Sequence, residues 1–136
     1  MTLGDRFLIA CTAVLEAEGE GPEGLRAVVW VIRNRMTAWL QDASEVCLSR
    51  LQFSCWNHDG HRRLALSRLF AGPVWVEALD AVDAMLAEDA VDLTGGATHY
   101  LNEAATRAGR KDGSVPPWFD EAKVTTRIGR HTFLIA

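Results

Sequence analysis

The chain has 136 residues, of which 49% are hydrophobic and 24% charged, a composition typical of one globular domain. Its formal net charge of −4 excludes the strong basic excess found in most nucleic-acid-binding domains. No apolar run approaches the roughly 20 residues needed to cross a bilayer, so we expect no membrane insertion. We therefore expect residues 1–136 to form a single domain that completes its core without a metal or a disulfide.

Two amphipathic helices are predicted at the start of the chain. Thr2 and Asp5 have the spacing of a capping box, and apolar residues follow at helical spacing as far as Glu18. The segment 19–22 breaks this helix, because it holds two glycines and a proline that suits the first turn of a new helix. The second helix carries an apolar stripe at steps of three and four, formed by Leu25, Val28, Val29, Ile32, Met36 and Trp39, with Arg26, Arg33 and Arg35 off the stripe. We expect this helix to be the axis of the core.

The second half of the chain changes from helix to strand. One helical turn is predicted within 44–48, and Pro73 opens a further helix whose expected apolar stripe is Trp75, Leu79, Val82 and Leu86. Residues 97–102 alternate as in a strand, whereas 106–117 are polar, rich in glycine and end in two prolines, as in a loop. The runs 124–128 and 131–135 are separated by Gly129 and Arg130, which is a hairpin signal. The predicted fold class is α+β, mainly helical, with a small three-stranded antiparallel sheet near the C-terminus.

The cysteines and the N-terminus bear on where the protein is made. The three cysteines are odd in number and lie in apolar sequence, which favours reduced, buried thiols: Cys11, Cys47 and Cys55. The apolar segment 7–15 is followed by acidic, glycine-rich residues in place of a small-residue cleavage site, so no signal peptide is evident. We expect a protein that is cytoplasmic at synthesis.

Four glutamates lie where the first helix ends: Glu16, Glu18, Glu20 and Glu23. The helix dipole disfavours negative charge at that end, but the last three are explained as solvated turn residues. Glu16 differs because it follows Val14 and Leu15 directly, so apolar packing should cover one side of it. A carboxyl group held in that way can keep its proton near neutrality, which is what a general acid for a glycosidic oxygen requires.

Four segments carry a pattern that covers nearly the whole chain in order. They are AVLEAEGEGPEGLRAVVWVIRNRM (13–36), QFSCWN (52–57), DLTGGATHYLN (92–102) and IGRHTFL (128–134). Together they resemble the motifs of the SleB-type, spore-cortex-lytic cell wall hydrolase family. The resemblance implies a helical core like that of lysozymes and lytic transglycosylases, and peptidoglycan glycan strands as the substrate.

The resemblance also implies a mechanism. The family's catalytic glutamate falls on Glu16, which would first protonate the oxygen between N-acetylmuramic acid and N-acetylglucosamine, and then act as base for the muramyl 6-hydroxyl. Such lytic transglycosylase action leaves a 1,6-anhydro end and needs no cofactor, no metal and no second carboxylate. A catalytic domain of this size resembles prophage or phage-derived particle members, so delivery to the cell envelope by a holin or a phage-like particle is expected.

Further residues are expected to bind the substrate. Tyr100 and Asn102 match family positions, Thr98 shares their predicted strand face, and His131 matches the closing motif. The remaining candidates are Gln52, Phe53, Ser54 and Trp118, the last as a sugar-stacking residue together with Trp56. Core packing for Tyr100, loop packing for 52–54 and a backbone-bonded position for His131 remain open.

Three other interpretations of the sequence remain. A non-catalytic module that binds peptidoglycan or builds a phage particle would tolerate a neutral residue at position 16. A muramidase or glucosaminidase would consume water, and it would need a second carboxylate that spacing alone does not place. A metal site at His58, Asp59 and His61 is disfavoured, because their spacing matches no standard zinc motif.

Overall fold

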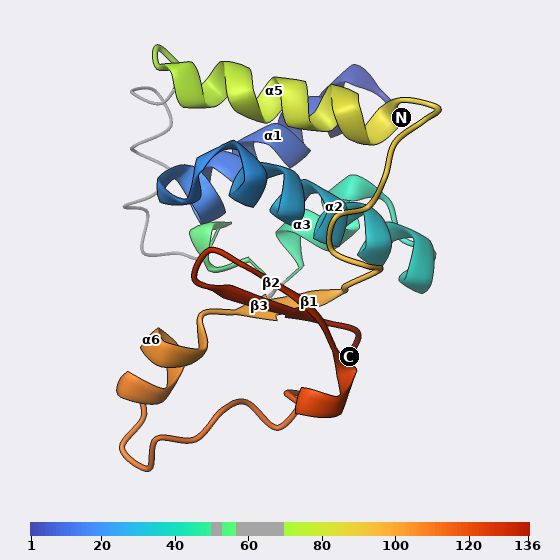
Figure 1. The fold of residues 1–136 in the computed structure, drawn as a ribbon. Helices are drawn as coiled ribbons and strands as arrows, with labels where there is room; N and C mark the ends of the chain where they lie inside the picture. The colour runs from blue at the N-terminus through green and yellow to red at the C-terminus, as the bar shows by residue number, and fades with distance from the viewer. Residues whose placement is uncertain (50–52, 57–69) are drawn as a thin grey trace.

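The computed structural model describes residues 1–49, 53–56 and 70–136 (Figure 1). The longer helices are α1 (Leu3–Ala17), α2 (Gly21–Trp39) and α5 (Pro73–Leu86), and the shorter ones are α3 (Ala43–Leu48) and α6 (Glu103–Ala108). Three-residue 3-10 turns form η1 (Glu18–Glu20), η2 (Ser54–Trp56) and η3 (Glu121–Lys123). The strands are β1 (His99–Leu101), β2 (Val124–Ile128) and β3 (His131–Leu134). The mainly helical α+β fold predicted from the sequence is confirmed.

The ends of the first helices lie where local signals place them. The Thr2 hydroxyl accepts from the main-chain nitrogen of Asp5 at 3.0 Å, and the Asp5 carboxylate accepts from the main-chain nitrogen of Thr2 at 2.9 Å, which closes the predicted capping box. Helix α1 ends at Ala17, and Pro22 lies in the first turn of α2. The three residues of η1 therefore separate two helices that pack against each other, and they place several acidic residues at the junction.

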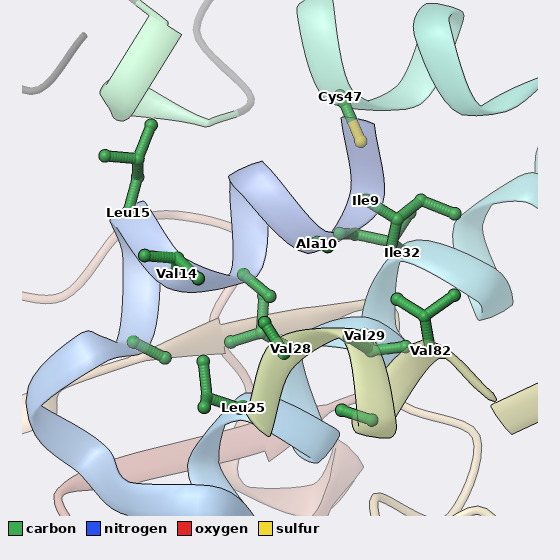
Figure 2. Close-up of a cluster of buried hydrophobic side chains, with 14 of the residues drawn as sticks. Ile9, Ala10, Val14, Leu15, Leu25, Val28, Val29, Ile32, Cys47 and Val82 are labelled. Atoms are coloured by element: carbon green, nitrogen blue, oxygen red, sulfur yellow. The ribbon is translucent and has the colours of Figure 1, made fainter. Parts of the chain in front are cut away.

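The core lies among α1, α2 and α5 (Figure 2). Its fully buried members include Ile9, Val14, Leu25, Val28, Val29, Ile32 and Val82, which the helical periodicity of α1 and α2 largely anticipates. Burying one such side chain is worth roughly 1.5–3 kcal/mol, so this cluster supplies most of the driving force that joins the helices. Cys11, Cys47 and Cys55 are buried thiols, as predicted.

Two helical predictions are wrong in detail. Helix α5 buries Ala78, Ala81, Val82 and Met85, whereas Leu79 is 36% exposed. The small alanines let α5 approach α1 and α2 closely, and this rotates the helix away from its most hydrophobic stripe. In α2, Arg35 was expected off the apolar stripe but is buried, while Trp39 lies on the stripe and is 37% exposed.

The sheet has the order β1-β3-β2 and is antiparallel throughout, so the predicted hairpin becomes β2 and β3. Tyr100 pairs with Phe133, and Ile128 pairs with His131 beside the turn at Gly129 and Arg130. In Figure 1 the sheet lies beneath α2, and α6 with the loop that follows it extends further from the helices. The predicted loop over 106–117 is wrong at its start, because residues 106–108 belong to α6, which ends at Ala108.

No helix in the described part of the chain is long and apolar enough to cross a membrane.

Candidate active site

Glu16 lies in the last turn of α1 and is held by two other elements. Its neighbours Leu15 and Ala17 are buried, and the Glu16 residue itself is half-buried. Glu16 Oε1 accepts a hydrogen bond from the main-chain nitrogen of Cys55 in η2 at 3.2 Å. Glu16 Oε2 accepts one from the Tyr100 hydroxyl on β1 at 3.1 Å. The carboxyl group is therefore oriented by donors from segments 39 and 84 residues away.

Tyr100 is fixed by the sheet and keeps its proton. Its ring centroid lies 5.2 Å from that of His131 and 5.7 Å from that of Phe133, both on β3. Burial raises the pKa of Tyr100 well above its ordinary value, and the nearby Glu16 carboxylate adds to the rise. The phenol therefore acts as a permanent hydrogen-bond donor toward Glu16.

His131 follows the hairpin turn and stands beside the same carboxyl group. Burial lowers the pKa of His131, although Glu20 and Glu16 pull it upward. The ring is therefore neutral near pH 7, so one nitrogen can donate and the other can accept a hydrogen bond.

Glu20 is a second carboxylate at this site. Its side chain is 13% exposed, and its Oε1 lies 3.0 Å from the guanidinium of Arg130 in the hairpin turn. The expectation that Glu20 is a solvated turn residue is therefore wrong, because a partner 110 residues away covers it. Glu23, by contrast, is exposed as expected.

A groove of about 500 Å³ opens between α6 and the hairpin. Its lining includes Asn102, Glu103, Arg127, Arg130 and His131. Asn102 caps α6, since its side-chain oxygen accepts from the main-chain nitrogen of Ala105 at 3.0 Å. The groove thus offers amide, imidazole and guanidinium groups next to the residues that hold Glu16.

The other substrate-binding candidates do not gather around Glu16. Thr98 is buried, and its hydroxyl accepts from the main-chain nitrogen of Ala136 at 3.2 Å, so it anchors the C-terminus. Trp118 is 38% exposed, but its ring centroid lies 4.9 Å from that of His99, at the end of β1 opposite to α6. Phe53 is buried in the core, with the Arg35 guanidinium 4.8 Å from its ring centroid.

Some predicted positions lie outside the described residues. These are Gln52 and the metal alternative at His58, Asp59 and His61. Of Ser54, the structure describes the main chain, which belongs to η2. Trp56 is described, and its indole nitrogen donates to the Thr12 hydroxyl at 2.9 Å. Within 1–49, 53–56 and 70–136, no three acidic, histidine or cysteine side chains gather in a way that could hold a metal ion.

Sequence reasoning missed the residues that fasten α2 to the sheet. Asn34 donates to Asp92 at 2.8 Å and to the carbonyl of Ala97 at 2.9 Å. Arg35 donates through Nε to the carbonyl of Thr98 at 2.5 Å. Both residues lie in the segment 13–36 that carries the family resemblance, and their structural role depends on contacts with residues about sixty positions further on.

The fold and the site together define a mainly helical α+β domain with a doubly anchored glutamate and a polar groove that His131 lines. A model of the cell wall hydrolase family matches residues 19–134, which include Glu20, Tyr100 and His131, while Glu16 lies just before the match. The chain therefore belongs to the cell wall hydrolase family, and the resemblance found in the sequence is confirmed.

Among solved structures, the catalytic domain of the Bacillus cereus SleB protein is similar in fold. The two share 24% sequence identity and a TM-score of 0.64, over 98% of this chain and 91% of that one. The search of curated protein sequences gives no match.

Proposed function

We propose that this protein cleaves peptidoglycan glycan strands as a lytic transglycosylase, with Glu16 as general acid and then as base. Membership of the cell wall hydrolase family supports peptidoglycan as the substrate. The observation that carries the assignment to Glu16 is that donors from β1 and η2 hold its two oxygens in place. A carboxyl group fixed in this way is positioned to transfer a proton in a defined direction.

The proposed reaction uses one carboxyl group twice. Glu16 gives its proton to the glycosidic oxygen as the bond from that oxygen to the muramyl C1 breaks, and N-acetylglucosamine leaves with a new hydroxyl. The resulting carboxylate takes the proton of the muramyl 6-hydroxyl while that oxygen bonds to C1. The product is a 1,6-anhydro sugar, Glu16 is protonated again, and no water is consumed.

Glu20 bears on the choice between this reaction and hydrolysis. A hydrolase needs a second carboxylate as base or nucleophile across the scissile bond. Glu20 lies at the site, which makes a water-consuming muramidase or glucosaminidase the second candidate. Its ion pair with Arg130 occupies one carboxylate oxygen at 3.0 Å, and this favours the single-carboxyl reaction.

The first test is the substitution Glu16→Gln, which keeps the shape and a hydrogen-bonding oxygen but removes the acid. We expect the release of soluble fragments from purified peptidoglycan to fall at least 100-fold, since general acid catalysis contributes about 10²–10⁴. Glu23→Gln is the matched control, because Glu23 is exposed on the first turn of α2. Parental activity in a folded Glu16→Gln protein would refute the assignment and leave a binding or particle module as the better description.

The second test is mass spectrometry of the digest. We expect anhydro-ended fragments, which are lighter by one water than hydrolysis products. Fragments with reducing ends alone would favour hydrolysis and direct attention to Glu20. Delivery of the protein to the wall, through a holin or a phage-like particle, stays a prediction.

A further inference from the structure

Glu20 occupies a closely fitted position between two glycines. A Cβ atom on Gly24, in the first turns of α2, would lie 2.4 Å from the Glu20 Cβ. A Cβ atom on Gly129 would lie 3.0 Å from Glu20 Oε2, and Gly129 also has a φ of +56° that favours glycine. Any side chain at either position would displace Glu20. The two glycines therefore leave room for the Glu20 side chain, Gly24 beside its Cβ and Gly129 beside its carboxylate.

The ion pair of Glu20 joins the junction of α1 and α2 to the hairpin of β2 and β3. Its partner Arg130 lies in the turn between β2 and β3, with a side chain that is 71% exposed. The guanidinium nitrogen is 3.0 Å from Glu20 Oε1, so the tip of the hairpin is held against the junction of α1 and α2. The residue after Arg130 is His131, whose ring contacts Tyr100 with 5.2 Å between centroids.

We propose that Glu20, through its ion pair with Arg130, is a positioning residue that holds His131 and Tyr100 against Glu16. Arg130 directly precedes His131 in the chain, the His131 ring contacts the Tyr100 ring, and the Tyr100 hydroxyl donates to Glu16 Oε2. The proposal rests on the function proposed above, because it assigns Glu20 to the placement of the acid instead of to the chemical step.

The fold and the reaction depend on this pair to different extents. An ion pair with one largely exposed partner adds little to the stability of a fold. A shift of about 1 Å in a catalytic group, however, can cost about 100-fold in rate. Loss of the pair should therefore lower kcat without lowering the melting temperature to a matching degree.

The test compares Glu20→Gln and Arg130→Ala with the parent protein on soluble peptidoglycan fragments. Arg6→Ala is the control, since it breaks a pair of exposed side chains, Arg6 and Asp83, between α1 and α5 at 3.7 Å. We expect at least a tenfold fall in kcat in both test variants, with KM changed less than threefold. Arg130→Lys keeps the positive charge and should restore most of the rate.

Nuclear magnetic resonance of the histidine rings supplies a readout that a purely structural role would not move. The His131 ring protons sense the Tyr100 ring, so their resonances should shift in Glu20→Gln and Arg130→Ala while those of His99 stay in place. Arg6→Ala should leave both unchanged. If Glu20→Gln does not fold, Arg130→Ala decides the matter, because Arg130 is exposed.

A folded Arg130→Ala protein with parental kcat and unmoved His131 resonances would overturn the proposal. So would a fall in kcat that Arg6→Ala reproduces. If Glu16→Gln abolishes cleavage while Arg130→Ala is fully active, the positioning role alone is wrong. If Glu16→Gln is itself active, the proposed function is wrong.

Discussion

Two polar clusters join the helices to the sheet, one around Asp92 and one around Glu16. They differ in the number of hydrogen bonds that the central carboxylate accepts from the described residues. In the first, Asp92 accepts from the main-chain nitrogen and hydroxyl of Thr94 at 2.8 and 2.6 Å, and from Gly96 and Asn34 at 2.8 Å each. In the second, each oxygen of Glu16 accepts one hydrogen bond within the described residues. A carboxylate has about four lone-pair sites, so the first cluster is saturated and the second is not.

The difference separates Asp92, whose oxygens are all used by the fold, from Glu16, the carboxyl group that we propose as the acid. Burial alone would raise the pKa of Asp92, but hydrogen bonds from Thr94, Asn34 and Gly96 together hold it below its ordinary value. Asp92 therefore stays ionised and fixes the turn that leads into β1. Glu16 is oriented by its two donors, and the described residues leave its other lone pairs for a proton or a substrate. The two clusters meet at β1, because Asp92 bonds to the turn before this strand and Tyr100 on the strand donates to Glu16.

The largest effect is expected from removal of the saturated carboxylate, in the variant Asp92→Ala. It leaves the main-chain nitrogens of Thr94 and Gly96 without this acceptor and takes one acceptor from the Asn34 amide, which keeps the Ala97 carbonyl. Unsatisfied groups of this kind cost about 1–3 kcal/mol each, and water at this half-buried site recovers part of that. We expect a loss of about 3 kcal/mol in the free energy of unfolding, measured by urea denaturation. The exposed neighbour Asp89→Ala is the control, and equal stability of the two variants would contradict the structural role.

A smaller effect, in rate and not in stability, is expected from Tyr100→Phe. The ring and its packing against His131 and Phe133 are kept, whereas the donor to Glu16 Oε2 is removed. We expect kcat to fall about tenfold, equivalent to roughly 1.4 kcal/mol, with the melting temperature nearly unchanged. Steady-state kinetics on peptidoglycan fragments would check this. Parental kcat would mean that Tyr100 is a core residue only.

The sequence predicts the parts of this molecule that local signals specify. The capping box of Thr2 and Asp5, the proline-started helices and the hairpin at Gly129 and Arg130 are confirmed, because each depends on residues close in the chain. The placement of Glu16 at the end of α1 follows in the same way.

Long-range pairings account for what the sequence does not predict. The partner of Glu20 lies 110 residues away, and Arg35 is buried against a carbonyl 63 residues away. One local signal for Glu20 was available. Gly24 lies four residues later inside a helix, where glycine costs about 1 kcal/mol relative to alanine, and such a residue indicates a close neighbour.

The smallest expected effect is on the pH dependence of stability, and it concerns the two histidines near Tyr100. His99 directly precedes Tyr100 on β1, and the His131 ring lies 5.2 Å from the Tyr100 ring. His131 belongs to the Glu16 cluster, whereas His99 lies on the side of Thr98, with its Nδ1 3.0 Å from the Thr98 hydroxyl. Burial lowers the pKa of His99 to about 4, and the positive charge of Arg35 adds to the effect.

Because the ordinary histidine pKa is about 6.5, the unfolded chain takes up a proton at position 99 below that pH while the folded chain does not until about pH 4. The contribution of neutral His99 to stability is therefore complete above pH 6.5 and is lost as the pH falls toward 4. Solvent screens a half-buried ring, so we expect at most about 1 kcal/mol between pH 7 and 5.5, above the range in which carboxylates titrate. Urea unfolding at several pH values should show this slope in the parent protein, a reduced slope in His99→Gln, and the His99 share of the slope retained in His131→Gln. An identical slope in His99→Gln would show that the His99 ring is hydrated in the folded protein and that its burial does not contribute to the pH dependence of stability.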